Sequence, residues 1–422
     1  MPGSTVLSDV RIADMSTVLF GPYCTQTLGD MGAEVVKVEP PEGDSFRFVG
    51  RPARTHGMGP CHMTLNRGKR SVQWDLQSMQ GRTALSRLIA RSDVFIHNLR
   101  TEAMDRLGFS FEAVKSIRPD IVYVHCVGFG SRGPYSGRPA YDDVVQALSG
   151  TASLLSRVDG HPEQRFLPTA LADKVSGLHA AYATLAALHH RNRTGEPVFV
   201  EVPMFEAVTH FMLEEHLYGQ TFTPPNGPVC YQRQVDPTRQ PIKTADGWIC
   251  IAPYTDARWV RLFEAAGQAD WLSQQGLTNA TSRYRHVGRL MGQMAQIMTN
   301  RTTADLMDML ARADIPAAPV NDIGALAEDP HLQAVGFFQP RTHPTEGDYL
   351  ELQPPVRFPG LPEVELRPAP LLGQHSEEIM RELGVEDESE AVSRPQADEA
   401  SERSGAPRVK IRRVRSVRDG RL

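Results

Sequence analysis

The fold class is decided by residues 10–39, VRIADMSTVLFGPYCTQTLGDMGAEVVKVE. Residues 10–15 and 34–39 are short apolar runs, which are typical of buried strands. The segment GPYCTQTLGDMG between them is predicted to be a helix, with Pro22 at its first position, where the missing N–H costs nothing. A strand, a helix and a second strand predict a βαβ unit with parallel strands. The start of this helix is a candidate anion site.

The same alternation continues to about residue 130. A helical pattern precedes a strand at residues 93–97, and a further strand is expected at residues 121–127. A long helix with Leu and Ala at helical spacing is expected at residues 172–191. The sequence therefore predicts an α/β domain with a mostly parallel sheet.

The later part of the chain has a different composition. Residues 218–239 are rich in proline and polar side chains, which is typical of a crossover between domains. We predict a large α/β domain at 1–220, a smaller α+β domain with linkers at 221–330, and a C-terminal segment at 331–385 that returns to the large domain. Residues 386–422 are acidic and then basic, which predicts a disordered tail, with weak binding of an anionic partner as the alternative.

Charge and hydropathy exclude several classes of protein. The 422 residues include 45 Lys and Arg against 50 Asp and Glu, and the net charge of -5 argues against a nucleic-acid partner. No apolar run approaches the roughly 20 residues that span a bilayer, and the first residues do not resemble a signal peptide. We therefore expect a cytoplasmic protein that does not contact a membrane. The five cysteines lack CxxC spacing, so neither a disulfide framework nor a zinc site is expected.

Familiar catalytic motifs are absent or incomplete. The sequence contains no HExxH, GxSxG or P-loop motif, and we expect no metal. Gly128, Gly130 and Gly133 match GxGxxG, but SRGPYSGRPA surrounds and follows the last glycine. A dinucleotide fingerprint needs a helix at that point, whereas this composition predicts a loop.

Asp173 is the residue with two competing interpretations. It stands immediately before KVSGLHAAYATLAAL, where an Asp can be a structural N-cap that contributes about 1 kcal/mol. Alternatively, a carboxylate held at a helix N-terminus can attack a thioester carbonyl. An Asp with an ordinary pKa of about 3.9 would be ionised at neutral pH and would need no general base. Spacing alone favours the cap.

From about residue 6 to residue 384 the chain resembles the class III CoA-transferase family, which includes formyl-CoA transferase, carnitine CoA-transferase and alpha-methylacyl-CoA racemase. Seven blocks carry the resemblance in the family's order: VRIADMSTVLFGPYCTQTLGDMGAEVVKVEPPEGDSFR, NRGKRSVQWDL, DVFIHNLRTEAMDRLGF, GFGSRGPYSGRPAYDDVVQALSG, ALADKVSGLHAAYATLAAL, IPAAPVNDIGALAEDPHLQ and RPAPLLGQHSEEIMRELG. Each block is modest alone, and their order makes the match specific.

The resemblance implies a transferase mechanism without a permanently bound cofactor. Asp173 fills the place of the family's catalytic aspartate, which attacks an acyl-CoA to give an acyl-aspartyl anhydride and then an aspartyl-CoA thioester. An acyl-CoA and a free carboxylic acid are the implied substrates. The implied fold is a Rossmann-like CoA-binding domain with a smaller domain, in a homodimer whose two chains interlock.

The resemblance also implies which residues contact CoA. They lie in the loop after the first strand, in the block after the second strand, and in three later segments: Val18, Leu19, Phe20, Pro40, Trp74, Asp75, Leu76, Gln77, Asn98, Leu99, Arg100, Arg106, Pro139, Ala140, Tyr141 and Asp142. Basic residues in the matched segments are candidates for the CoA phosphates, with a solvated surface charge as the alternative: Arg47, Lys69, Arg70, Arg100 and Arg106.

The chain departs from the family's pattern in two places. The racemase branch has a His–Asp pair where this chain has Tyr141 and Asp142. A tyrosine with a pKa of about 10 is a poor base at neutral pH, so transferase chemistry is favoured over racemisation. The glycine-rich loop of formyl-CoA transferase is also missing, which weakens an oxalate or formyl specificity. A racemase and a non-catalytic CoA-binding homologue remain the alternatives.

Overall fold

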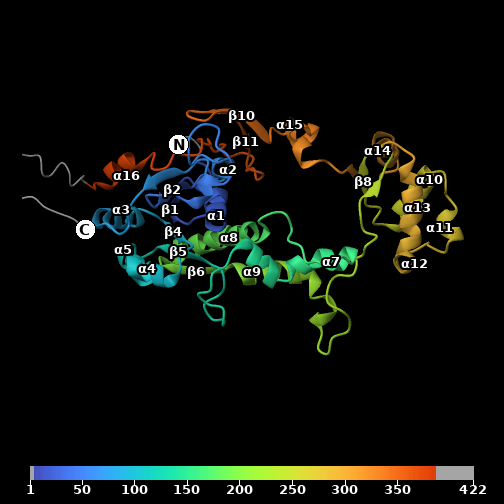
Figure 1. Cartoon of the computed structure of the whole chain (residues 1–422), viewed down its shortest axis with the longest axis horizontal. Helices are drawn as coiled ribbons and strands as arrows, with labels where there is room; N and C mark the ends of the chain where they lie inside the picture. Colours follow the sequence, from blue (N-terminus) through green and yellow to red (C-terminus); the bar gives the residue numbers. More distant parts are fainter. Residues whose placement is uncertain (1–3, 386–422) are drawn as a thin grey trace, which may run out of the picture.

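The computed structural model describes residues 4–385 (Figure 1). The predicted tail at 386–422 lies outside the described residues. The chain forms a mixed α/β fold, as predicted, built on a six-stranded sheet.

All neighbouring strands of the large sheet are parallel, and their order is β3-β2-β1-β4-β5-β6. The strands are β1 (Arg11–Met15), β2 (Glu34–Glu39), β3 (Arg70–Gln73), β4 (Val94–His97), β5 (Val122–Val127) and β6 (Val198–Pro203). The chain order reverses between β1 and β4, and the carboxyl ends of strands at such a switch point are the usual ligand site of an open α/β sheet.

Neighbouring residues of a strand point to opposite faces of the sheet, and helices cover both faces. Ile12 packs into one core with α1 (Phe20–Gly29) and α8 (Leu171–Thr194), while Ala13 packs into the other with α3 (Met79–Ala90). The first core also includes α9 (Met204–His216), and the second includes α4 (Thr101–Leu107), α5 (Phe111–Ile117) and α16 (Ser376–Leu383).

Helix α8 crosses α1 at very short range. A Cβ on Gly177 would lie 2.9 Å from the carbonyl oxygen of Phe20 and 3.0 Å from the ring of Tyr23. Only a glycine therefore fits at this crossing without displacing backbone. The close approach fixes the start of α8 beside the turn that follows β1.

A second, smaller sheet has the antiparallel order β7-β8-β9. Its strands and helices are β7 (Ile242–Lys243), β8 (Trp248–Ile251), β9 (Ala317–Pro319), α10 (Asp256–Ala265), α11 (Trp271–Gln274), α12 (Ala280–Arg285), α13 (Val287–Thr299) and α14 (Thr303–Arg312). These elements share a separate apolar core, and Figure 1 shows them apart from the six-stranded sheet.

The chain then returns to the large sheet. An antiparallel hairpin of β10 (Phe338–His343) and β11 (Gly347–Leu352) precedes α16. Arg70 on β3 pairs with Glu378 and Glu382 of α16 at 2.8 and 2.7 Å, and these ion pairs dock the helix on the edge of the sheet. The remaining helices are η1 (Ser45–Phe48), α2 (Pro60–Leu65), α6 (Asp142–Leu148), η2 (Thr151–Ser153), α7 (Leu154–Asp159), η3 (Tyr218–Thr221), η4 (Ile323–Glu328) and α15 (Pro330–Ala334).

Three sequence predictions concern where helices begin, and the structure corrects two of them and confirms the third. Helix α1 begins at Phe20, so Pro22 is its third residue and not its first. Helix α8 begins at Leu171 with Ala170 as N-cap, so the prediction of Asp173 at the N-cap position was wrong. No helix follows Gly133 directly, since the next one, α6, begins at Asp142; the loop prediction for GxGxxG is confirmed.

Candidate active site

A cavity of about 460 Å³ opens at the carboxyl ends of β1, β4, β5 and β6. Thr17 and Val18 follow β1, Asn98 follows β4, and Gly128 follows β5, so the cavity lies at the switch point of the sheet. Asp173, in the first turn of α8, lines the same cavity.

The cavity brings together about half of the predicted site residues. Those that line it are Val18, Phe20, Asn98, Leu99, Arg100, Pro139, Ala140, Tyr141 and Asp173. Those that do not line it are Leu19, Pro40, Trp74, Asp75, Leu76, Gln77, Arg106 and Asp142. The segment after β3 lies two strands away from β1, so only an extended ligand could reach both regions.

The structural cap of α8 is Asp142, not Asp173. Oδ1 of Asp142 accepts hydrogen bonds from the backbone N–H groups of Ala172 at 2.6 Å and Asp173 at 3.1 Å. Its second oxygen accepts from Nε2 of Gln146 at 2.7 Å. Asp142, the first residue of α6, therefore satisfies the free donors at the start of α8.

This arrangement leaves the Asp173 side chain free for chemistry. Within residues 4–385, no group donates a hydrogen bond to its carboxyl oxygens. Burial, and secondarily the negative charge of Asp142, raises the pKa of Asp173 to about 7. The expectation of an ordinary, fully ionised aspartate at neutral pH was therefore wrong. A raised pKa in a cavity is a common property of catalytic groups.

The turn after β1 is held by the side chain of Asn98. Oδ1 of Asn98 accepts from the N–H of Thr17 at 3.0 Å, and Nδ2 donates to the carbonyl oxygen of Thr17 at 2.9 Å. The amide of Asn98, predicted to contact CoA, is thus engaged within the protein. Arg100, two residues further on, lines the cavity.

The glycine-rich loop after β5 is also fixed by side chains. The N–H of Gly130 donates to Oε1 of Glu206 at 2.9 Å, and the N–H of Ser131 donates to Oε1 of Glu201 at 3.1 Å. These donors are therefore occupied by carboxylates, which would repel a pyrophosphate. The contacts explain physically why the GxGxxG spacing does not form a dinucleotide site.

Three of the basic residues proposed for CoA phosphates are engaged elsewhere. Arg47 is buried and pairs with Glu39 at 2.6 Å, while Lys69 is buried and lies 3.4 Å from Asp14. Arg70 binds the acidic residues of α16 described above, so these three candidates were wrong. Arg106 is exposed outside the cavity, and Arg100 is the candidate that lines it.

Several titratable residues of the cavity, His125 and Glu201 among them, were not singled out from the sequence. His125 on β5 pairs in register with Glu201 on β6, and both line the cavity. Burial lowers the pKa of His125 below its ordinary value, so the ring is neutral at pH 7. The signal was available, because titratable side chains at the carboxyl ends of parallel strands converge on one edge.

Residues 4–385 contain no group of three or more His, Cys, Asp or Glu side chains placed to bind a metal ion. No helix in the same range is both long and apolar enough to span a bilayer.

The chain is similar to known proteins over most of its length. The model of CoA-transferase family III matches residues 7–376. A succinyl-CoA:mesaconate CoA-transferase of Haloarcula marismortui is 31% identical over 392 residues, which cover 90% of this chain and 97% of that protein. A formyl-CoA:oxalate CoA-transferase of Rhodopseudomonas palustris is 31% identical over 414 residues, with 91% and 95% covered. The crystal structure of a CAIB/BAIF family protein from Brucella suis superposes with a TM-score of 0.77 at 27% identity, with 90% and 100% covered.

Proposed function

We propose that this chain, which belongs to CoA-transferase family III, moves CoA from an acyl-CoA to a free carboxylic acid with Asp173 as the nucleophile. One observation carries the assignment of the nucleophile. The Asp173 carboxyl lines the switch-point cavity and takes no part in capping its own helix, because Asp142 performs that task.

In the proposed first step, a carboxylate oxygen of Asp173 attacks the thioester carbonyl carbon, the C–S bond breaks, and CoA leaves as the thiolate. The thiolate then attacks the Asp173 carbonyl of the resulting anhydride and releases the donor acid. An aspartyl-CoA thioester remains. The acceptor carboxylate then attacks the aspartyl-CoA thioester, which gives a new anhydride and free CoA thiolate. The thiolate attacks the acyl carbonyl of this anhydride, which forms the new acyl-CoA and regenerates the Asp173 carboxylate.

The neighbouring Asp142 favours these steps electrostatically. Its charge and the burial of Asp173 both disfavour the ionised form of Asp173, which is why the pKa lies near 7. At that pH about half of the molecules carry the reactive carboxylate. Formation of the anhydride or the thioester removes the charge of Asp173 and so relieves its repulsion with Asp142.

We propose that CoA is bound by those predicted residues that line the cavity, among them Val18, Asn98, Arg100 and Tyr141. The nucleotide end is proposed to extend toward residues 74–77, which follow β3 at the same edge of the sheet. Binding energy from this remote part of the substrate can offset the cost of forming the intermediates. We also propose a homodimer as the working assembly.

The names of the two relatives suggest the substrate class. They act on the CoA esters and free acids of succinate, mesaconate, formate and oxalate, which are small carboxylates, most of them dicarboxylates. We propose acceptors of this class for the present chain.

The test is a panel of small mono- and dicarboxylic acids offered with succinyl-CoA or formyl-CoA. Formation of a new acyl-CoA, followed by liquid chromatography, is the expected result. Deuterium incorporation at the alpha carbon of a 2-methylacyl-CoA, without CoA transfer, would instead assign the racemase alternative. Neither reaction with any donor would support the non-catalytic alternative.

A further inference from the structure

The turn between β1 and α1 contains a strained residue. Val18 has a φ of 67°, in the left-handed region. A β-branched residue rarely adopts this conformation, because its side chain collides with the backbone there. Such strain persists only where the surroundings enforce it, and it is concentrated at functional sites. Val18 lines the same cavity as Asp173.

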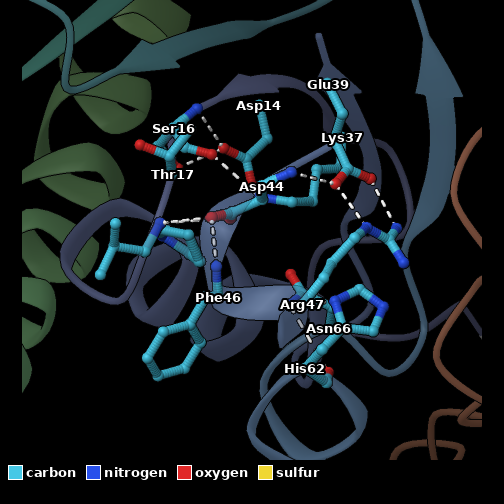
Figure 2. A network of polar contacts seen from close by, with 12 residues as sticks. Asp14, Ser16, Thr17, Lys37, Glu39, Asp44, Phe46, Arg47, His62 and Asn66 are labelled. Atoms are coloured by element: carbon cyan, nitrogen blue, oxygen red, sulfur yellow. Dashed lines mark hydrogen bonds and ion pairs between the residues drawn. The ribbon is translucent and has the colours of Figure 1, made fainter. Parts of the chain in front are cut away.

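A buried ion pair enforces the conformation of Val18. Its N–H donates to both carboxyl oxygens of Asp44, at 3.0 and 3.1 Å. Nζ of Lys37 lies 2.9 Å from Oδ2 of Asp44, and the side chains of Lys37 and Asp44 are 0% and 1% exposed. Figure 2 shows Asp44 between Lys37 and the turn.

The residues before Val18 are held in the same way. Lys37 also donates to the carbonyl oxygen of Ser16 at 2.9 Å, and Asp14 accepts from the N–H of Ser16 at 2.9 Å. With the two bonds between Asn98 and Thr17, buried or half-buried side chains bind the backbone of three consecutive residues. The turn therefore has little freedom to relax.

We infer that Asp44, supported by Lys37, is a positioning residue for the transfer reaction. By holding Val18 in the left-handed conformation it fixes one wall of the cavity in which Asp173 reacts; this inference rests on the proposed function. Attack on a thioester requires near-attack geometry, and small displacements of the walls that orient it reduce the rate strongly.

Stability alone does not account for this ion pair. A buried pair repays its desolvation poorly, and an apolar pair of similar volume is often as stable. An apolar side chain in place of Asp44 could not accept a hydrogen bond from the N–H of Val18. The charged pair thus supplies what an apolar pair cannot, a buried acceptor aimed at the N–H of the strained Val18 and also at the N–H of Phe46.

The test replaces the pair by apolar residues in Lys37→Met/Asp44→Leu, and then adds Val18→Gly. Glycine adopts positive φ without support, so it should remove the need for the acceptor. The matched control is Arg67→Met/Asp30→Leu, which removes another largely buried ion pair, at 2.7 Å, without touching the turn. Should the Leu variant fail to fold, Lys37→Met/Asp44→Ala replaces it.

The readout is single-turnover trapping with succinyl-CoA and hydroxylamine, which converts aspartyl-CoA at Asp173 into a hydroxamate that mass spectrometry detects. The rate constant of hydroxamate formation and the final fraction of protein that carries the hydroxamate are measured separately. We expect the pair variant to lose about tenfold or more in rate constant at an unchanged labelled fraction, with a recovery of at least about threefold on adding Val18→Gly. The control should keep the rate constant of the wild type.

A pair variant that lowers only the labelled fraction would overturn the inference, since that result describes lost folding and not lost geometry. A rate loss that Val18→Gly does not relieve, or an equal loss in the control, would overturn it as well. Failure of the proposed function is distinguishable, because the wild-type protein itself would then give no hydroxamate with any donor of the panel.

Discussion

Two groups of carboxylates in this protein, one buried and one half-buried, have opposite surroundings. Beneath the turn after β1, cations pair with the acidic side chains: Glu39 contacts Arg47, and Asp44 contacts Lys37 (Figure 2). At the start of α8, by contrast, Asp173 lies near another acid, Asp142, whose negative charge disfavours its ionisation. Burial opposes ionisation in both places, but only the first group has the charges and hydrogen bonds that overcome it.

The pKa values express this difference. Burial alone would raise the pKa of Glu39, but hydrogen bonds from Arg47 and the charges of Lys37 and Arg47 lower it to about 2. The pKa of Asp173 instead rises to about 7. In our proposal the paired carboxylates hold the shape of the site, whereas Asp173 is the group that reacts.

The largest effect should follow from removing the unpaired carboxylate. Asp173→Ala is expected to reduce CoA transfer by roughly three orders of magnitude or more, because the proposed covalent intermediate forms on the Asp173 carboxylate. Steady-state transfer in the carboxylate panel measures it. Thermal unfolding should show an intact fold, since Asp142 caps α8. More than a few per cent of the wild-type rate would remove Asp173 from the mechanism.

Breaking the Glu39–Arg47 pair should affect the stability of the fold and not the transfer reaction. Glu39→Gln leaves the buried Arg47 guanidinium without its counter-charge, which is expected to cost about 3–5 kcal/mol in the free energy of unfolding. Urea denaturation measures this cost. The matched control is Glu112→Gln, which breaks an exposed pair with Lys115 and should change stability by about 1 kcal/mol or less.

The same pair predicts a pH dependence of stability. Because the pKa of Glu39 is about 2 in the folded state and near 4.5 when unfolded, its contribution is full above pH 4.5 and is lost as the pH falls toward 2. Urea denaturation at several pH values should show this loss in the wild type. In Glu39→Gln the acid-dependent loss should be smaller, and an equal loss would contradict the account.

A smaller effect is expected from changing the neighbour of the nucleophile. Asp142→Asn keeps an oxygen that can cap α8 but removes the negative charge, so the pKa of Asp173 should fall. The acid limb of the profile of kcat/KM against pH, expected near pH 7 in the wild type, should move to lower pH. Asp143→Asn, a change at the exposed neighbouring residue, should leave the profile in place.

The smallest effect concerns the stability of the site itself. The folded pKa of Asp173 lies above its unfolded value, so the site is destabilised increasingly as the pH rises from about 4 to 7. Asp173→Asn should therefore raise Tm by a few degrees at pH 8, with a gain that shrinks toward pH 5. Scanning calorimetry at the two pH values measures it, and a gain independent of pH would argue against a raised pKa.

Local patterns were sufficient to predict the framework of this site. The βαβ rhythm gave strands β1, β2, β4 and β5 nearly at their observed bounds, and the family blocks pointed to Asp173. Strands β3 and β6 were not singled out. The motif VFVEV of β6 has an alternating pattern, and recognising it would have placed Glu201 at the carboxyl edge of the sheet.

Contacts between distant segments could not be predicted in the same way. Asp142 caps a helix 30 residues later in the sequence, so the helix signal at Asp173 was attributed to the wrong residue. Arg47 and Lys69 lie in blocks that resemble the CoA-transferase family, yet their side chains pair with Glu39 and Asp14 in the interior. Spacing reveals which residues share an element, but not which partner across the fold they meet.

The central claim is that Asp173 is the group that carries CoA. Its most direct measurement is the site of hydroxylamine modification after incubation with succinyl-CoA, located by peptide mass spectrometry. We predict a hydroxamate at Asp173 that requires the acyl-CoA, with none at Asp142. Modification at Asp142 or at another carboxylate, or CoA transfer without any modified aspartate, would contradict the account.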